Sequence, residues 1–131
     1  MGAFDVLRIA GSGLGMHQTW LDTLAHNIAN ANTVRSTADD AFQAQLLVAE
    51  ADEEGGVRVA QIAEGSAEGR LVLAPDHPLA DAEGYVRMPA MNMETQMTDL
   101  IVAQRGFQAS AQVTSYAQDT YNTAMRIGQA R

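Results

Sequence analysis

The sequence predicts a mainly α-helical fold in which two long terminal helices pack as a coiled-coil-like pair, with a short β-hairpin subdomain between them. Three observations support this. Apolar residues recur every seven positions from Leu7 to Ile28 and again from Met93 to Tyr121. Between these runs, apolar and polar residues alternate from Phe42 to Val48. A period of seven indicates helices that pack lengthwise on another helix, and alternation indicates a half-buried strand.

The first helix is expected from Phe4 to Ala31. Its two apolar rows are Leu7, Leu14, Leu21 and Ile28, and Ala10, His17, Leu24 and Ala31. The carboxylate of Asp5 lies in the first turn, where it suits the positive end of the helix dipole. Asn30 and Asn32 mark the end of the helix, since asparagine tolerates the left-handed conformation with which many helices stop.

Residues 34–91 have a different composition. Strands are expected at Phe42–Val48 and Val57–Ile62, and Gly55-Gly56 favours a hairpin between them with a solvated acidic tip at residues 50–54. A third short strand is expected at Arg70–Leu73. The following "PDHPLADAEGYVRMP" holds all three prolines and is predicted to be extended or turned.

The second helix is expected from Met93 to Ile127. Its rows are Met93, Leu100, Phe107, Thr114 and Tyr121, with Met97, Ala111 and Met125 beside them. Asn92 is its expected N-cap, and Gly128 is expected just past its end. A helix of roughly 50 Å exceeds the diameter of a compact domain of this size, about 36 Å, and so needs another surface along its length. The domains are therefore predicted as 1–33 with 92–131, and a β-rich insert at 34–91.

Composition argues against several classes of partner. The formal net charge is −8 and no segment is rich in Lys or Arg, which disfavours nucleic acid and anionic membrane surfaces. There is no cysteine, and charged residues interrupt the first 30 positions too often for a membrane span or the apolar core of a cleaved signal peptide. The chain is 47% hydrophobic but only 5% aromatic. Its many alanines favour close helix packing and hint at assembly.

The sequence offers no site for catalysis, a metal or a cofactor. "GSGLG" lies inside the expected helix, so Gly11 and Gly15 are interpreted as a smooth face for close helix contact and not as a nucleotide loop. His17 and His26 fall on opposite helix faces, His26 is expected to form a solvated pair with Asp22, and His77 is expected in a turn. The chain lacks GxSxG, HExxH and calcium-loop patterns.

The cluster "LAHNIANANTV" contains three asparagines near the end of the first helix. Amides buried between helices are costly unless they are hydrogen-bonded, so they can select one alignment. We hypothesise that Asn27 and Asn30 lock helix register or the exit of the chain, while Asn32 only helps to end the helix. The alternative is that all three simply end it.

"LAHNIANANT" resembles the N-terminal signature of the flagellar rod and hook axial protein family, with matches at Asn27, Ile28, Ala29, Asn30 and Thr33. Residues 75–97 resemble the segment typical of proximal-rod members of that family. Its matching residues are Pro78, Leu79, Ala80, Asp81, Gly84, Tyr85, Val86 and Pro89. "RGFQAS" is similar to an Arg-x-aromatic-Gln-Ala-Asn stretch of the family, with Ser110 in place of the last asparagine.

This resemblance implies a structural subunit of the basal-body proximal rod, without catalytic residues, in a periplasm-spanning, torque-transmitting shaft. It implies export through the flagellar type III apparatus without a cleaved signal, helices in the inner layer, and an outward-facing insert. Expected partners are the protein itself, other rod proteins including the distal rod, and the membrane ring or export-gate adaptor at the rod base. Direct membrane insertion is not expected.

The expected assembly contacts are the helix rows. They comprise Leu7, Ala10, Gly11, Leu14, Gly15, Leu21, Leu24, Asn27, Ile28, Asn30, Met93, Met97, Leu100, Phe107, Ala111, Thr114, Tyr121 and Met125. Isolated chains are predicted to have partly disordered ends, because narrow stripes bury too little alone to offset ordering entropy. The alternatives are another rod subunit or, in a different class, a soluble helical adaptor or secretion chaperone.

Overall fold

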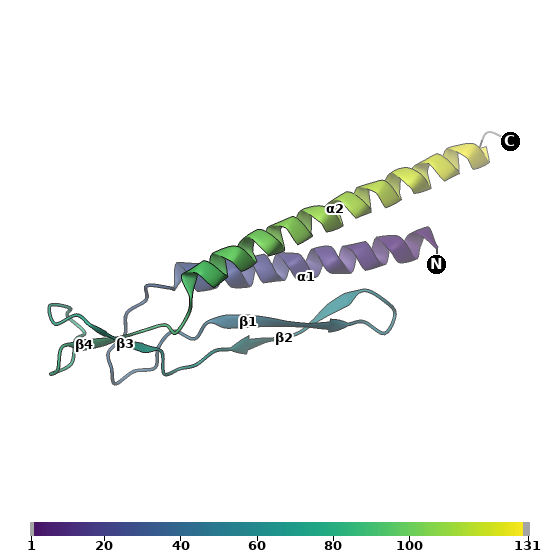
Figure 1. Cartoon of the computed structure of the whole chain (residues 1–131). Coiled ribbons are helices and arrows are strands. Elements are labelled where there is room, and N and C mark those ends of the chain that lie inside the picture. Colours follow the sequence, from purple (N-terminus) through teal and green to yellow (C-terminus); the bar gives the residue numbers. More distant parts are fainter. Residues whose placement is uncertain (1, 130–131) are drawn as a thin grey trace.

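Two long antiparallel helices lie side by side, with one β-hairpin along the first helix and a second beyond the end where they join the insert (Figure 1). The structure, a computed structural model, describes residues 2–129. Its elements are α1 (Ala3–Ala29), β1 (Gln45–Ala51), β2 (Val57–Glu64), β3 (Arg70–Leu73), β4 (Tyr85–Met88) and α2 (Met93–Gln129). The predicted fold class, mainly α with a small β insert, is confirmed.

Helix α1 begins with a carboxylate cap and ends with an amide. The backbone N–H of Gly2 donates to Asp5 Oδ2 at 2.8 Å. At the other end, Asn30 Nδ2 donates to the carbonyl of His26 at 2.9 Å, and Thr33 Oγ1 donates to Asn30 Oδ1 at 3.2 Å. Asn30 has φ −103°, so the expected left-handed ending is wrong: side-chain hydrogen bonds end this helix instead.

Strands β1 and β2 form an antiparallel hairpin with a bulge between Val48 and Ala49. Gly55 and Gly56 turn the chain with φ +88° and +98°, as the glycine pair predicted. The first strand begins at Gln45 and not at Phe42, because Asn27 of α1 fixes the backbone of Gln45 (below), while the ring of Phe42 lies against His26.

The second hairpin pairs β3 with β4 in antiparallel register. Strand β3 was expected; β4 was not, because four residues after a turn carry little periodic signal. The turn is fixed by Asp81, whose Oδ1 accepts hydrogen bonds from the backbone N–H groups of Tyr85 at 2.7 Å and Glu83 at 3.1 Å. His77 lies in the preceding turn, as predicted.

Helix α2 starts as expected, since Asn92 Oδ1 accepts the backbone N–H of Thr95 at 3.1 Å. It does not stop before Gly128, because that glycine lacks the positive φ of a helix-ending cap and the helix continues to Gln129. Its 37 residues give a length of about 55 Å, and its C-terminal end extends past the start of α1 (Figure 1). Within residues 2–129, no helix is both long and apolar enough to cross a membrane.

The buried core is thin and consists mostly of small side chains. Its apolar members are Ala10, Leu24, Ala31, Ala41, Val86 and Ala103. Among residues 2–129, fourteen large hydrophobic side chains remain exposed, many of them on α2. Where such exposed side chains adjoin one another, the apolar patch they form marks an interaction site.

Candidate functional site

The contact between α1 and α2, which we call the seam, has one fixed antiparallel register. Asn27 faces Gln96, and His17 faces Gly106, ten residues earlier on α1 and ten later on α2. Gly13 faces Ser110, where a β-carbon on the glycine would lie 3.2 Å from the serine hydroxyl. Each step forward along α1 is therefore matched by one step back along α2.

Small residues let the two helices approach closely at the seam. Ala103 is fully buried, and a β-carbon at Gly106 would overlap the imidazole of His17. The Nδ1–H of His17 donates to the carbonyl of Gly13 at 2.7 Å, which holds the ring in place. The close approach of the two helices therefore depends on small residues at the seam as much as on apolar contacts.

The residues of the predicted α1 rows and of the first α2 row are buried or half-buried within the chain, and their contact with other subunits stays a prediction. They include Leu7, Ala10, Leu14, Leu21, Leu24, Ile28, Met93, Leu100, Phe107, Thr114 and Tyr121. The companion row on α2 lies at Gln96, Ala103, Ser110 and Ala117, whereas Met97 and Met125 are 44% and 47% exposed. Within the chain, the row that faces α1 thus lies one residue before the predicted row, because the seam selects small residues; contact of Met97 and Met125 with other subunits stays a prediction. Ala111 is half-buried.

Gly11 and Gly15 do not contribute to the close approach within the chain. Both are exposed, and a β-carbon on either would meet no atom within 4 Å. Gly13 and Gly106 make the close contacts instead. Any role of Gly11 and Gly15 in packing is therefore against another molecule, which stays a prediction.

Asn27 joins α1, β1 and α2 through its side chain. Its Nδ2 donates to the carbonyl of Gln45 at 2.8 Å and to Gln96 Oε1 at 2.9 Å, while its Oδ1 accepts the N–H of Gln45 at 2.8 Å. The residue is 1% exposed. Asn30 acts only at the helix end, and Asn32 is exposed. Within the chain, register is thus fixed by Asn27 and not by the pair of asparagines.

An open apolar groove runs along one flank of the seam. Its first part has a volume of about 430 Å³ and is lined by Val6, Ile9, Ala10, Ala109, Ser110 and Val113. A second part of about 330 Å³ is lined by Val6, Val113, Tyr116, Ala117 and Thr120. We call these two parts together the apolar groove. A third hollow continues from Tyr116 and Thr120 along α2 to Ile127.

Outside the two rows predicted for the second helix, the sequence contains a further stripe that contributes to this groove. Val102, Ala109, Val113, Tyr116, Thr120 and Ile127 follow one another at helical spacing on α2. This stripe lies beside the first predicted row of α2, and its residues belong to neither of the two rows predicted there. It remains exposed in the chain, with Val113 at 47% and Tyr116 at 63%.

Among residues 2–129, no three His, Asp or Glu side chains lie close enough together to hold a metal ion. The expected pair of Asp22 and His26 is not formed: Asp22 Oδ1 accepts a hydrogen bond from Gln18 Nε2 at 3.1 Å, and His26 stacks near Phe42. The pKa of Asp81 is lowered, chiefly by the hydrogen bond from the backbone N–H of Tyr85.

Comparison with known proteins identifies both ends of the chain. Residues 7–35 match the family described as "Flagella basal body rod protein", and residues 82–127 match "Flagellar basal body rod FlgEFG protein C-terminal". The chain is 37% identical to the flagellar basal-body rod protein FlgC of Yersinia enterocolitica, covering 98% of this chain and 100% of that protein. It is 33% identical to FlgC of Salmonella typhimurium over the same shares, and 27% identical to FlgC of Borreliella burgdorferi over 97% of this chain and 98% of that protein.

Proposed function

This chain belongs to the family of the flagellar basal-body rod protein FlgC, and we propose that it assembles by receiving a helix of the next rod subunit in its apolar groove. It is a structural subunit of the flagellar basal-body rod, it acts at the basal body, and it interacts with other rod proteins.

The observation that carries the groove proposal is the unpartnered stripe on α2. Residues 109–127 span about 27 Å of helix, enough for five turns of a second helix to lie alongside. The walls are almost wholly apolar, as helix-in-groove recognition requires. Beyond Tyr121, whose ring meets that of Phe4 at 5.5 Å between centroids, α2 has no facing turn of α1. A rod subunit is surrounded by other helical subunits, so a neighbouring helix is the occupant that this surface fits.

Further features follow from family membership as proposals. The subunit lies in the proximal rod, contacts the membrane ring or export-gate adaptor below and the distal rod above, and transmits torque. It is exported by the flagellar type III apparatus without a cleaved signal. Residues 1–33 and 92–131 form the inner helical layer, and residues 34–91 face outward. Its relatives are rod proteins by name, which supports a structural role for this chain.

The groove proposal is tested by placing a charge in the groove without disturbing the seam. Val113→Asp puts a carboxylate in the groove wall, and Gln112→Asp puts the same group on the neighbouring exposed position as the matched control. In a strain lacking the native gene, we expect Gln112→Asp to restore swimming and Val113→Asp to fail, with both proteins equally stable. Equal swimming in the two strains would overturn the groove proposal, while basal bodies that keep a normal rod after gene deletion would overturn the rod assignment itself.

A further inference from the structure

We propose that the exposed face of the β3–β4 hairpin docks on a flank of α2 in a second copy of this chain. The docking face, which we call the hairpin face, consists of Leu71, Leu73 and Tyr85. The receiving surface, which we call the outer flank of α2, consists of Met97, Ile101 and Arg105. It is separate from the apolar groove, because Ile101 and Val102 of the groove stripe are successive residues and point about 100° apart around the helix.

The β3–β4 hairpin carries apolar side chains on both of its faces. Leu71, Val72 and Leu73 form a continuous apolar run, which is typical of a strand that is covered on both sides. The chain itself covers only one side: Val72 pairs with Val86, which is 1% exposed, whereas Leu71 and Leu73 are 58% and 63% exposed. The hairpin face therefore lacks the cover that its residues predict.

The hairpin face is formed before any partner arrives. Tyr85 lies opposite Leu73 in the strand pairing, so their two side chains share this face. The turn that joins the strands is fixed by hydrogen bonds: Asp81 Oδ1 accepts the backbone N–H of Tyr85, and His77 Nδ1 accepts that of Leu79 at 3.1 Å. A face that is already ordered loses little conformational entropy when a partner covers it.

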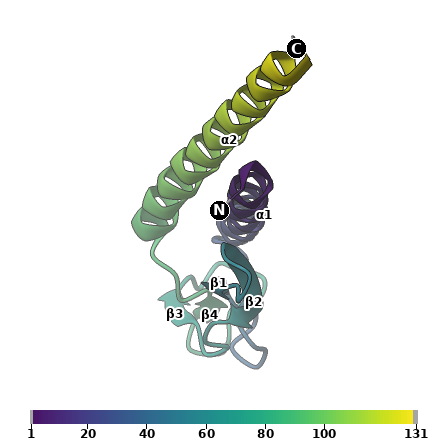
Figure 2. The same ribbon diagram turned by 90° about the vertical axis from the view of Figure 1, so that its right-hand side faces the viewer.

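Neither helix of the same chain covers the hairpin face. Within residues 2–129, neither β3 nor β4 lies against α1 or α2, and Figure 2 shows the hairpin below both helices. The turn between the two strands carries Asp76, Asp81 and Glu83 but no arginine or lysine. The partner is therefore expected to combine apolar side chains with a positive charge.

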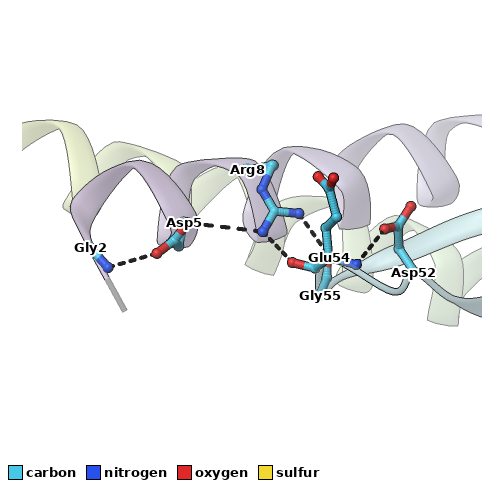
Figure 3. A network of polar contacts seen from close by, with 6 residues as sticks. All are labelled: Gly2, Asp5, Arg8, Asp52, Glu54 and Gly55. Atoms are coloured by element: carbon cyan, nitrogen blue, oxygen red, sulfur yellow. Dashed lines mark hydrogen bonds and ion pairs between the residues drawn. The ribbon is translucent and has the colours of Figure 1, made fainter.

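Most arginines of the described chain are engaged elsewhere. Arg8 is held at the tip of the β1–β2 hairpin, where its guanidinium donates to the carbonyls of Glu54 and Gly55 (Figure 3). Arg58 forms an ion pair with Glu50. Three more arginines belong to the sheet of β3 and β4 itself, namely Arg35, Arg70 and Arg87. Two arginines of α2, Arg105 and Arg126, are left within residues 2–129.

Arg105 is the arginine of α2 that lies among exposed apolar side chains. Met97, Ile101 and Arg105 follow one another at intervals of four, so they share one flank of the helix. Ile101 is 54% exposed, and within residues 2–129 Arg105 pairs with no carboxylate. The described residues one turn away from Arg126, at positions 122, 123 and 129, are all polar. The outer flank thus has both properties that the hairpin face requires.

Because this chain carries both surfaces, the partner that fits each of them is a second copy. In such a contact, the leucines and Tyr85 cover Met97 and Ile101, and the acidic turn faces Arg105. A helix packed on the apolar face of a sheet is the ordinary layer arrangement of these elements. The two surfaces differ, so the contact is heterologous and repeats from one copy to the next, as a helical shaft requires.

Disulfide cross-linking in basal bodies tests this contact, because the chain contains no cysteine. A strain that lacks the native gene expresses two variants together, Leu73→Cys and Ile101→Cys. After mild oxidation we expect an adduct of two chains, and none when either variant is expressed alone. Thr123→Cys in place of Ile101→Cys is the matched control, since this exposed position lies about 33 Å further along α2 and should give no adduct.

Basal bodies that contain both variants but give no adduct would overturn the proposal, as would an equal adduct with the Thr123 control. Charge reversal gives a second readout that needs no cysteine. We expect Arg105→Glu to impair swimming, Glu83→Arg in the same chain to restore it, and Arg126→Glu to have no effect. Equal swimming of the Arg105→Glu and Arg126→Glu strains would also overturn the contact. All these chains keep the apolar groove unchanged, so the result does not depend on what the groove receives.

Discussion

The imidazole of His17 occupies the space that a β-carbon at Gly106 would need. This pair fixes how closely α1 and α2 approach near the middle of the seam. Close to this pair, α2 presents Ala103, Gly106 and Ser110 to α1, and none of these three supplies a large apolar surface. Three features thus hold the helix pair together: the close fit of small residues, the hydrogen bonds of the buried Asn27 amide, and the half-buried rows.

Gly106→Ala should destabilise the isolated chain despite the better helix propensity of alanine. Overpacking at a tight contact costs about 1–3 kcal/mol, more than the roughly 1 kcal/mol that alanine gains over glycine in a helix. Gly15→Ala is the control, since its β-carbon meets nothing, and it should be neutral or stabilising. Urea unfolding measures both. His17→Ala should relieve the Gly106→Ala defect; equal stability of the two glycine variants would refute the tight contact.

Asn27→Ala should be among the most destabilising polar substitutions in the chain. It strands the N–H and C=O of Gln45 and the amide of Gln96 without their partner, at a cost of about 2–4 kcal/mol. Asn32→Ala, at an exposed position, should change the free energy of unfolding by less than about 0.5 kcal/mol. Urea denaturation of the wild type and the two variants tests this. Similar midpoints for all three would show that Asn27 does not hold α1, β1 and α2 together.

A larger side chain at the exposed glycine positions of α1 should affect assembly but not folding. Gly11→Leu adds a side chain where the chain itself leaves open space, so circular dichroism should match the wild type and the free energy of unfolding should be unchanged or higher. If Gly11 packs against a neighbouring subunit, as the sequence predicted, swimming should fall sharply. Normal swimming with normal folding would show that this face is free in the rod.

Acid should weaken the β3–β4 turn through Asp81. Its pKa is lowered in the folded chain by hydrogen bonds to the ionised carboxylate, first that from Tyr85 N–H. The stabilisation is therefore present above the unfolded pKa of about 3.9 and is lost as pH falls through the lower folded value. Asp81→Asn should be less stable than the wild type at pH 7 and lose less stability below pH 4 or so. Parallel pH dependence of the two proteins would contradict this.

The sequence predicted the helices and the first hairpin well because those signals are local. Heptad spacing placed α1 and α2 to within a few residues, and Gly55-Gly56 located the turn. Strand β4 was not predicted, because its pairing is set by Asp81 and by long-range contacts of Arg87 with Arg35 and Thr37. Such contacts leave no period in the sequence.

The candidate site was predictable in part. The first heptad rows and the importance of Asn27 could be inferred from spacing and from the cost of burying an amide. The companion row at Ala103 and Ser110 could not, because size complementarity between two helices depends on which residues face each other. The groove needs the same knowledge, since Val6 and Val113 are 107 positions apart in the sequence and meet only after the helices pair.

The most direct test of the central claim is cross-linking from the groove inside assembled basal bodies. A photoreactive amino acid at position 113 should capture another rod subunit through one of its helices, and the same probe at position 112 should not. Adducts at 113 that map to a neighbouring helix would establish the groove as an assembly surface. Basal bodies that contain the probe protein but give no adduct at 113, or equal adducts at both positions, would contradict the account.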